Sequence, residues 1–380
     1  MKILHVIRGL SNSSGTTHIV VPLAEEQARA GHDVTVYCVE KPDAAPVRPS
    51  TDAVTTRCFP TSVHSPKYGL SLPFTRAVRQ EITHFDVVHI HAVWNFPTYY
   101  TMRAAGRADV PYVVAPQGSF DPWALREGAR AKAFYGRFVE RPLLRRCAFL
   151  QALTQKEALQ FEDYGLDAPT VIIPNGVDMQ QFERQAPRLG ERLGLPPGSK
   201  TLLYLSRIDP KKGLDVLIRA FAHLRNERPD IFLVIAGHDA GYGHEPGIRA
   251  LVSSLGLEAA CRLLGEVKGD AKYDTLLGAD AFALTSHSEG LPIAVLEAMA
   301  AGLPVVVSHE CNVPAVAERN TGFLVSPEVD EVAVALRELF ADEERARRMG
   351  DEGRRLVRER FTWSSISSAT IRAYQEARPE

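Results

Sequence analysis

Short apolar runs alternate with longer stretches of mixed polarity along the first half of the chain. Continuous apolar runs are typical of buried strands, and apolar residues three and four positions apart are typical of helices. The expected strands are residues 2–7, 33–39, 86–90, 112–115, 147–152 and 171–173, and the expected helices are residues 17–30, 72–83 and 97–106. This alternation predicts a parallel β-sheet with helices on both faces.

The same alternation begins again after residues 179–200, a segment rich in proline, glycine and charge that we interpret as a linker. Its expected strands are residues 201–206, 231–236, 262–264, 281–284 and 304–307, and its helices are residues 214–225, 248–255, 273–277, 294–301, 332–340, 343–358 and 364–377. The chain is therefore expected to be an α/β protein with two parallel-sheet domains. We place the N-terminal domain at residues 1–185, the C-terminal domain at residues 186–362, and a last helical segment at residues 363–380.

Length and composition agree with two globular domains. A chain of 380 residues is too long for one ordinary hydrophobic core. Its 44 Lys and Arg residues are balanced by 46 Asp and Glu residues, which excludes a general nucleic-acid-binding protein. The N-terminus has a strand pattern rather than that of a signal peptide, and no run approaches the 18–20 or so apolar residues of a membrane-spanning helix. We therefore expect a cytoplasmic protein that does not cross a membrane.

The five cysteines are odd in number and widely spaced along the chain. The sequence contains no C-x-x-C pair and no Cys/His cluster. This pattern implies neither disulfides nor a zinc site, and it favours a reducing compartment.

Ligands of open parallel sheets bind at the carboxyl ends of the strands, so the loops from strand to helix are the places to search for function. Gly15 stands immediately before the first expected helix, where backbone N–H groups can approach an anion; a plain turn is the alternative. His91 ends the strand in HIHAVW, on the same side of that strand as His89. A lone histidine is more often structural than functional, and we assign the structural role to His89.

Charged residues follow two expected strands of the second domain. Arg207 and Lys212 belong to the loop SRIDPKKG, where a guanidinium can hold two phosphate oxygens and an ammonium adds a point charge. Glu289 belongs to the loop after residues 281–284, and Glu297 to the second turn of the next helix. Because that helix, LEAMAAG, is otherwise apolar, the Glu297 carboxylate needs partners. On spacing alone, a solvated helix face is the alternative.

The stretch TSHSEGLPIAVLEAMAAGLPV, residues 285–305, holds Glu289 and Glu297 eight positions apart, with SEG, EAMA and G-x-P around them. It resembles the E-x7-E signature of retaining GT-B glycosyltransferases, specifically glycosyltransferase family 4. The resemblance spans nearly the whole chain and is most specific between residues 201 and 325. It implies a GT-B fold, in which two Rossmann-like domains face a central cleft and the last helix crosses back to the first domain. It also implies retaining transfer of a hexose-type sugar from a nucleotide diphosphate sugar.

The resemblance implies a role for each candidate residue. His91 is expected beside the transferred sugar, and Glu289 is expected to contact hydroxyls of the donor sugar. Glu297 is expected to hold the ribose, while Arg207 and Lys212 hold the diphosphate. Since two cations then do the work of a divalent metal, and the chain has no D-x-D motif, we expect no metal. We likewise expect no cofactor, with a UDP- or GDP-sugar as the substrate.

Two positions depart from the family pattern. Ser14, next to Gly15, replaces one of the paired glycines that the family usually has in the first loop. This substitution bears on how closely the loop can approach the phosphates. Ala315, in NVPAV, stands where members commonly have glutamate, which concerns local shape or the fit of the acceptor.

Other functions stay open on the sequence. A GT-B-type sugar-nucleotide epimerase or a glycan phosphorylase would share the fold, and a non-catalytic nucleotide-binding subunit would share the domain pattern. The stretch GYGHEPG, from residue 241, lacks the glycine spacing of a dinucleotide fingerprint, which argues against a dehydrogenase. The stretches PQGSFDPWAL and ERPLLRR resemble those of enzymes that build exopolysaccharide, capsule or O-antigen. We therefore expect a glycan or polyprenyl-linked acceptor in surface polysaccharide biosynthesis.

Residues 123–146 combine basic and aromatic side chains. Seven basic residues against Glu127 and Glu140 leave five net positive charges, in a chain whose net charge is −2. The basic members are Arg126, Arg130, Lys132, Arg137, Arg141, Arg145 and Arg146, and the aromatic members are Trp123, Phe134, Tyr135 and Phe138. This composition predicts a helix that docks peripherally on an anionic membrane surface. A solvated helix whose aromatic side chains pack inward is the alternative.

Overall fold

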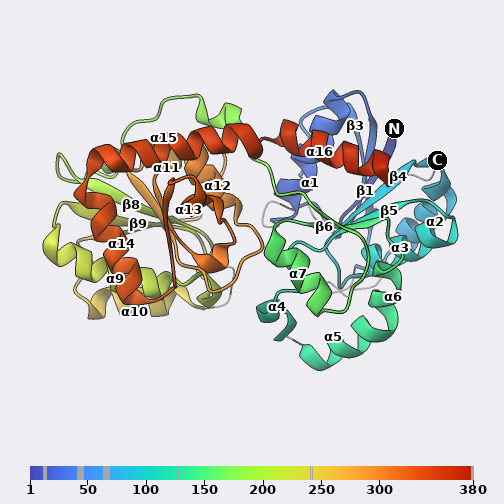
Figure 1. Cartoon of the computed structure of the whole chain (residues 1–380), viewed down its shortest axis with the longest axis horizontal. Helices are drawn as coiled ribbons and strands as arrows, with labels where there is room; N and C mark the ends of the chain where they lie inside the picture. Colours follow the sequence, from blue (N-terminus) through green and yellow to red (C-terminus); the bar gives the residue numbers. More distant parts are fainter. Residues whose placement is uncertain are drawn as a thin grey trace. The chain divides into compact units, whose positions relative to one another are not determined.

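The computed structural model describes residues 1–11, 15–40, 47–62, 69–126, 128–239, 241 and 243–377. The chain divides into two compact units, each with its own sheet (Figure 1). The first unit consists of Met1–Gly176 and Trp363–Glu380, and the second of Val177–Thr362. The last helix of the chain therefore belongs to the first unit, whereas the expected linker, residues 179–200, belongs to the second.

The sheet of the first unit has seven parallel strands in the order β3-β2-β1-β4-β5-β6-β7. The strands are β1 (Lys2–Val6), β2 (Asp33–Glu40), β3 (Val54–Pro60), β4 (Val87–His91), β5 (Tyr112–Ala115), β6 (Phe149–Ala152) and β7 (Thr170–Ile172). Strands β4, β5 and β6 are buried along their whole length, as expected of continuous apolar runs in a parallel sheet. The chain reverses its direction of travel across the sheet between β1 and β4, so their carboxyl ends form a topological switch point, where such sheets bind ligands.

Helices connect these strands and cover both faces of the sheet (Figure 1). They are α1 (Thr17–Arg29), α2 (Leu72–Glu81), η1 (Ile82–His84), α3 (Phe96–Arg107), α4 (Pro122–Arg126), α5 (Ala129–Tyr135), the π-helical turn η2 (Gly136–Glu140), α6 (Arg141–Leu144), α7 (Gln155–Asp163) and α16 (Trp363–Glu376). Polar side chains cap the N-termini of several of these helices. Asn95 accepts the Thr98 N–H ahead of α3, and Thr154 accepts the Glu157 N–H ahead of α7, each at 3.2 Å.

The second unit repeats this topology with six parallel strands in the order β10-β9-β8-β11-β12-β13. The strands are β8 (Lys200–Leu205), β9 (Ile231–Ala236), β10 (Cys261–Gly265), β11 (Ala281–Leu284), β12 (Val305–Ser308) and β13 (Gly322–Val325). The switch point lies between β8 and β11. Both loops that contain the charged candidate residues therefore begin at this edge.

The helices of the second unit also lie on both faces of its sheet (Figure 1). They are η3 (Met179–Phe182), α8 (Leu189–Arg192), η4 (Pro210–Lys212), α9 (Leu214–Glu227), α10 (Glu245–Ser254), α11 (Asp270–Gly278), α12 (Ile293–Ala300), η5 (His309–Cys311), α13 (Ala315–Glu318), α14 (Val329–Ala341) and α15 (Glu343–Arg360). Helix α12 is buried from Val295 to Ala300. Helix α15 packs so closely on the turn after α12 that a Cβ on Gly350 would overlap the carbonyl oxygen of Gly302.

The predicted α/β fold with two Rossmann-like parallel sheets is confirmed, but the expected elements omit several that the structure contains, among them strands β3 and β13 and helix α7. Strands β3 and β13 lie at sheet edges, and both contain partly exposed residues, so they lack a continuous apolar run. Helix α7, QKEALQFED, is mostly polar and buries only three residues. Periodicity alone detects such elements poorly, because little of their surface faces a core.

The expectation of one helix across residues 123–146 is wrong. This segment contains α4, α5, η2 and α6 in succession. Gly128, with φ of +67°, separates α4 from α5, and a π-helical turn separates α5 from α6. Among the helices of the described chain, none combines the length and apolarity needed to cross a bilayer.

Candidate functional site

The loops after β8 and β11 are joined by backbone contacts at the switch point of the second unit. Thr285 donates its hydroxyl to the Gly213 carbonyl at 2.7 Å, and the His287 N–H donates to the Lys211 carbonyl at 2.8 Å. Gly213 has φ of +61°, and a Cβ there would overlap the carbonyl oxygen of Thr285. Glycine is therefore required at this crossing, and the two loops are held in one arrangement.

Lys212 and Glu289 form an ion pair across these loops. The Lys212 ammonium donates to Glu289 Oε1, and the two side chains are only 12% and 10% exposed. Ser286 donates its hydroxyl to the same oxygen at 2.8 Å. A carboxylate this buried needs both the opposite charge and hydrogen bonds. The contact brings together two residues that the sequence placed on separate loops.

The backbone of the Glu289 loop is fixed as well. The Glu289 N–H donates to the Glu310 carbonyl at 3.0 Å. The Asn312 side-chain amide donates to the carbonyls of Glu289 and Gly290. Asn312 adopts φ of +58°, a conformation that asparagine tolerates better than most residues. The carboxylate is thus presented by a rigid loop rather than a mobile one.

Arg207 lies on the same loop as Lys212, but its side chain is freer. Its guanidinium is 46% exposed, and Nη2 lies 3.8 Å from Asp209 Oδ2. Its backbone carbonyl accepts the Tyr204 hydroxyl at 2.9 Å. Burial, followed by the charge of Glu289, raises the pKa of Tyr204, so this hydroxyl keeps its proton and donates. The structure fixes the backbone of Arg207 while its guanidinium stays accessible.

Glu297 lies in α12 and pairs with Lys272 of α11. Lys272 Nζ lies 2.6 Å from Glu297 Oε1, with side-chain exposures of 25% and 11%. Burial lowers the pKa of Lys272, but the neighbouring Glu297 and Tyr273 outweigh burial and raise it. The Lys272 side chain is therefore a charged ammonium at neutral pH, next to the Glu297 carboxylate. Within the described chain, the structure records no hydrogen bond between Glu297 and the Lys212–Glu289 pair.

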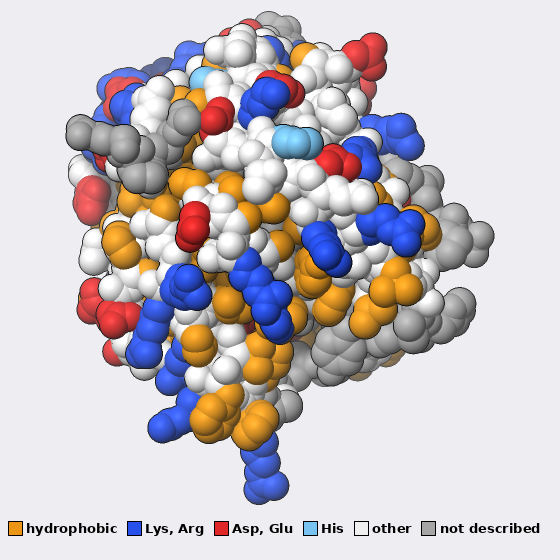
Figure 2. Space-filling view, turned by 90° about the vertical axis from the view of Figure 1, so that its right-hand side faces the viewer, with side chains coloured by type: hydrophobic (Ala, Val, Ile, Leu, Met, Phe, Trp, Pro, Cys, Tyr) orange, Lys and Arg blue, Asp and Glu red, His pale blue; other side chains and the backbone are white. Residues whose placement is uncertain are grey.

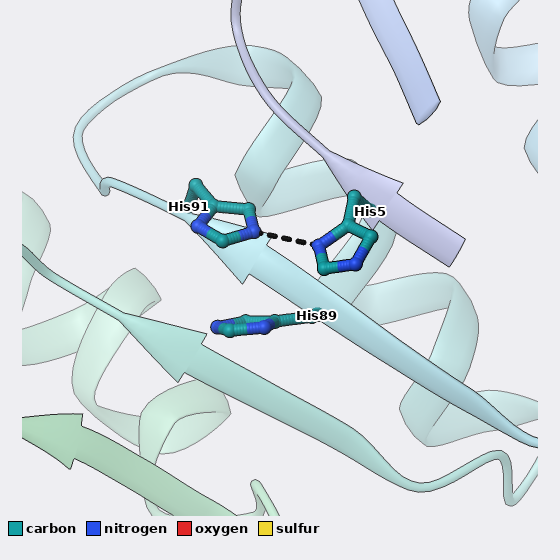
Figure 3. A group of neighbouring side chains, drawn as sticks. All are labelled: His5, His89 and His91. Carbon is teal, nitrogen blue, oxygen red and sulfur yellow. Dashed lines mark hydrogen bonds between the residues drawn. The ribbon is translucent and has the colours of Figure 1, made fainter. Parts of the chain in front are cut away.

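The first unit places three histidines together at its own switch point (Figure 3). His5 of β1 is in register with His89 of β4, and His91 ends β4. All three side chains are at most 1% exposed, and their ring centroids lie 4.1 to 5.3 Å apart. Burial lowers the pKa of His5 to about 4 and holds the pKa values of His89 and His91 well below their usual range. The cluster is therefore neutral.

The rings are linked to each other and to polar neighbours. His5 Nδ1 lies 2.9 Å from His91 Nε2, and His5 Nε2 lies 2.7 Å from Gln27 Oε1. Gln117 Nε2 lies 3.4 Å from His91 Nδ1. His89 Nδ1 lies 2.6 Å from the hydroxyl of Tyr374 in α16, which ties the last helix to this sheet. Both ring nitrogens of His91 thus face protein groups.

Among the described residues, two groups of side chains have three possible metal-ligand atoms within 4.8 Å, namely the histidine cluster and Cys38, Glu40 and Cys58. Strand pairing creates both groups, since Cys38 and Cys58 are partners in register on β2 and β3. The two thiols are free, with their sulfurs 2.7 Å apart. His5 and His91 are hydrogen-bonded to each other and His89 Nδ1 contacts the Tyr374 hydroxyl, so we assign no metal to either group.

Gly15 precedes α1 in an exposed turn, and a Cβ on it would meet nothing within 4 Å. The N-cap residue, Thr16, makes no side-chain hydrogen bond to the helix. The structure thus places Gly15 in an exposed turn just ahead of α1, where the sequence predicted it. Ser14 lies outside the described residues.

The surface over residues 123–146 is apolar and basic. Phe134, Phe138 and Trp123 are 69%, 61% and 40% exposed. Figure 2 shows hydrophobic and basic side chains next to one another at the lower edge of the face that it draws. Glu140 is only 1% exposed and accepts the Trp94 N–H at 3.1 Å, so it does not offset the surface charge. Glu127 lies outside the described residues.

Sequence reasoning missed Lys272 and His5, which contact candidate residues directly, and Gln27, which contacts His5. Lys272 lies 25 positions before its partner, and no local pattern links the two. His5 had a weak signal, because ILHVI and VVHIH are both strands with an inward histidine. Only the pairing of β1 with β4 shows that these histidines meet.

The chain is similar to described families over nearly its whole length. Residues 13–181 match the family described as Glycosyltransferase Family 4, and residues 186–356 match Glycosyl transferases group 1. A D-inositol 3-phosphate glycosyltransferase of Kineococcus radiotolerans is 30% identical, over 97% of this chain and 92% of the relative. A protein of the same description from Nocardia farcinica is 27% identical, over 97% of this chain and 86% of the relative.

Solved structures share the fold. Anabaena Alr3699/HepE in complex with UDP has a TM-score of 0.79 and 21% identity, covering 99% of this chain and 100% of that chain. WaaG, a glycosyltransferase involved in lipopolysaccharide biosynthesis, has a TM-score of 0.73 and 18% identity, covering 98% of this chain and 99% of that chain. At these identities, the likeness shows the fold alone.

Proposed function

The chain belongs to glycosyltransferase family 4, and we propose that it is a retaining hexosyltransferase that uses a UDP- or GDP-sugar without a metal. The observation that supports this most strongly is the Lys212–Glu289 ion pair at the carboxyl edge of the second sheet. A diphosphate requires cations, and a sugar hydroxyl requires a hydrogen-bond acceptor. The pair offers both on two loops held in one arrangement.

In this proposal, Arg207 and Lys212 hold the diphosphate. The guanidinium of Arg207 is accessible and loosely paired, so binding a phosphate costs it little. Lys212 exchanges the Glu289 carboxylate for a phosphate oxygen when the donor binds. Both cations then stabilise the negative charge that builds on the leaving diphosphate, which is the work of a divalent metal in other transferases. No metal and no cofactor are needed for this step.

Glu289 and Glu297 divide the rest of the donor between them. Once Lys212 turns to the phosphate, the Glu289 carboxylate keeps its hydrogen bond from Ser286 and accepts hydroxyls of the donor sugar. Its negative charge stabilises an oxocarbenium-like transition state, while the leaving phosphate serves as the base. Glu297 accepts the ribose hydroxyls, and the Lys272 ammonium orients that carboxylate.

The first unit contributes Gly15 and His91. In this proposal, the exposed turn at Gly15, ahead of α1, provides backbone N–H groups to an anion. His91 acts beside the sugar through its backbone carbonyl at the end of β4, because both ring nitrogens face protein groups. This carbonyl steadies the positive charge that develops on the transferred sugar.

A panel of UDP- and GDP-sugars tests the reaction class. We expect one donor to raise the melting temperature and to be hydrolysed slowly in the absence of an acceptor. Conversion of the sugar without loss of the nucleotide would indicate an epimerase. Phosphate-dependent cleavage of a glycan would indicate a phosphorylase. Binding without turnover of any donor would indicate a non-catalytic subunit.

The acceptor has two candidates. We propose a glycan or polyprenyl-linked oligosaccharide of surface polysaccharide biosynthesis, which agrees with the stretches PQGSFDPWAL and ERPLLRR. A phosphorylated polyol is the second candidate, since the relative that is 30% identical over 97% of this chain is described as acting on D-inositol 3-phosphate. Offering both acceptors with the donor from the panel separates them, because only the true acceptor accelerates release of the nucleotide.

We further propose that the surface over residues 123–146 docks on the cytoplasmic face of an anionic membrane. Exposed Phe134 and Phe138 enter the interface, and the basic side chains around them contact anionic headgroups at about 1 kcal/mol each. Vesicle co-sedimentation should increase with anionic lipid and decrease with salt. Phe134→Ser with Phe138→Ser should reduce binding, and exposed Leu255→Ser of the second unit serves as the matched control. Binding indifferent to lipid charge, or equal loss in both variants, would contradict this role.

A further inference from the structure

Four side chains of the first unit, three of them buried and one half-buried, form a row of hydrogen bonds. Gln27 of α1 contacts His5 of β1, His5 contacts His91 of β4, and His91 contacts Gln117 after β5. The distances along the row are 2.7, 2.9 and 3.4 Å. Figure 3 shows its central hydrogen bond, between His5 and His91.

This row has a direction. A neutral imidazole has one N–H and one lone pair, so a donor at one nitrogen requires an acceptor at the other. The Gln27 carbonyl oxygen faces His5 Nε2, which must therefore have the proton. His5 Nδ1 then accepts from His91 Nε2, and His91 Nδ1 is left with a lone pair.

The other end of the row requires the same direction independently. Gln117 presents its amide nitrogen to His91 Nδ1, and an amide nitrogen can only donate. The orientations of two amides at opposite ends thus agree on one tautomer for each ring. Burial keeps both imidazoles neutral, since it lowers the pKa of His5 to about 4 and that of His91 well below its usual range.

Turning the Gln117 amide nitrogen inward leaves its carbonyl oxygen without a partner. Gln117 Oε1 is buried and accepts no hydrogen bond from the described residues. The residue itself is half-buried and has φ of +54°, a conformation uncommon for glutamine. A buried carbonyl without a donor is costly, and a ligand hydroxyl would satisfy it.

We propose that His5 and Gln27 are positioning residues, which fix His91 as its Nε2–H tautomer and so present Gln117 Oε1 as an acceptor for a sugar hydroxyl. This inference rests on the proposed sugar-binding function of the first unit's switch point. The direction of the row decides which atom of the Gln117 amide faces the ligand. In the reversed direction, the amide would present its N–H donor in place of its carbonyl acceptor.

The tautomers can be observed directly in the unmodified protein. Histidine labelled with ¹⁵N, studied by long-range proton–nitrogen correlation at neutral pH, distinguishes protonated from bare ring nitrogens. We expect His5 and His91 to be protonated at Nε2 and bare at Nδ1. Protonation of both rings at Nδ1 would overturn the proposal. The experiment needs neither donor nor acceptor, so its outcome is independent of the transferase assay.

A double-mutant cycle tests the direction energetically. Gln27→Glu keeps the direction of the row, because a carboxylate can only accept a hydrogen bond. Gln117→Glu reverses the direction, and the Gln27 amide must then flip. With glutamate at both ends, the row lacks a proton between the rings. We expect the double variant to lose more than tenfold in the folding equilibrium beyond the two single effects, or to take up one proton on an imidazole.

The matched control is Gln27→Met with Gln117→Met, which removes both ends without imposing a direction and should be additive within twofold. Additive behaviour of the glutamate pair would contradict the proposal. The tautomers of the unmodified protein decide the question even where a double variant does not fold.

The affinity for nucleotide sugars tests the proposed contact between Gln117 and the ligand. Gln117→Met should weaken binding of the best UDP- or GDP-sugar by about three- to tenfold, the loss of one hydrogen bond, and leave binding of UDP and GDP unchanged. Equal loss for the bare nucleotides, or no loss for any donor that binds the unmodified protein, would remove Gln117 from the ligand face.

Discussion

The two units place opposite kinds of chemistry at the same point of the same fold. At the switch point of the second unit, Lys212 and Glu289 are charged and paired. At that of the first unit, His5 and His91 are buried and neutral, because burial lowers both pKa values. A charged edge suits an anion such as a diphosphate, and a neutral edge of donors and acceptors suits hydroxyl groups. One topology can thus present two kinds of chemistry through different side chains at the ends of its strands.

Removing the carboxylate charge from the second edge should have the largest effect. Glu289→Gln should lower turnover by about 10²–10³-fold, because the amide cannot stabilise developing positive charge. Affinity for the nucleoside diphosphate should survive, since Lys212 remains. Steady-state kinetics and titration calorimetry measure the two effects. Turnover that stays within tenfold of the unmodified protein would exclude Glu289 from the chemistry.

A substitution at the crossing of the two loops should have the next largest effect. Gly213→Ala should destabilise the protein by about 3 kcal/mol or more, because alanine is strained at this φ and its Cβ overlaps Thr285. Gly15→Ala is the matched control in the first unit, where a Cβ meets nothing, and should cost at most about 0.5 kcal/mol. Chemical denaturation compares them. Equal stability of the two variants would show that the loops are not joined as described.

Glu140 of the first unit can be compared with Glu289, because both are buried carboxyl groups but Glu140 has no lysine partner among the described residues. Burial raises its pKa to about 7 from an ordinary value of 4.5. Between these values the folded chain holds a proton that the unfolded chain has lost, so this group makes stability fall as pH rises. The loss reaches about 3 kcal/mol above pH 7.

Glu140→Gln should remove this decline. The difference in unfolding free energy between the two proteins, measured by denaturation from pH 4 to 8, should therefore grow with pH in favour of the variant. A constant difference across that range would show that Glu140 titrates normally.

Single cations of the charged edge should have a smaller effect. Arg207→Ala should weaken binding of UDP or GDP by about 1.5–3 kcal/mol, the value of a hydrogen bond to a charged group. Lys212→Ala should do the same, and also leave Glu289 buried without its cation. Calorimetry on both variants tests the assignment. Unchanged affinity in both would place the diphosphate elsewhere.

The smallest expected effect is that of chelation. If two cations do the work of a metal, EDTA should leave turnover of the donor unchanged. Arg207→Ala provides the internal check, because a metal-independent enzyme should also show no rescue of this variant by manganese. Loss of turnover in EDTA, restored by manganese, would refute the metal-free proposal.

The sequence predicted the charged edge better than the neutral one. Glu289, Lys212 and Arg207 lie in loops whose residue types and spacing carry the family resemblance, and the structure brings the first two into contact. The partners Lys272 and His5 were missed, because each meets its candidate residue only through tertiary packing. The same reason separates predicted from missed strands: β11 is a continuous buried apolar run, whereas β3 is a partly exposed edge strand.

Residues 123–146 show a second limit. Their composition indicated a helix with a basic and aromatic surface, and exposed Phe134 and Phe138 agree with that surface. The count of charges treated Glu140 as part of it, but the π-helical turn directs this carboxyl to the Trp94 backbone. Composition reports which side chains are present in a segment; only the backbone path decides which of them are exposed.

We propose that the Lys212–Glu289 edge carries out glycosyl transfer with retention. Following the best donor of the panel by proton NMR, without an acceptor, tests it most directly. We predict that the released sugar first appears with the anomeric configuration of the donor, and that Glu289→Gln abolishes the signal. Initial appearance of the opposite anomer, or no consumption of any donor by the unmodified protein, would contradict the claim.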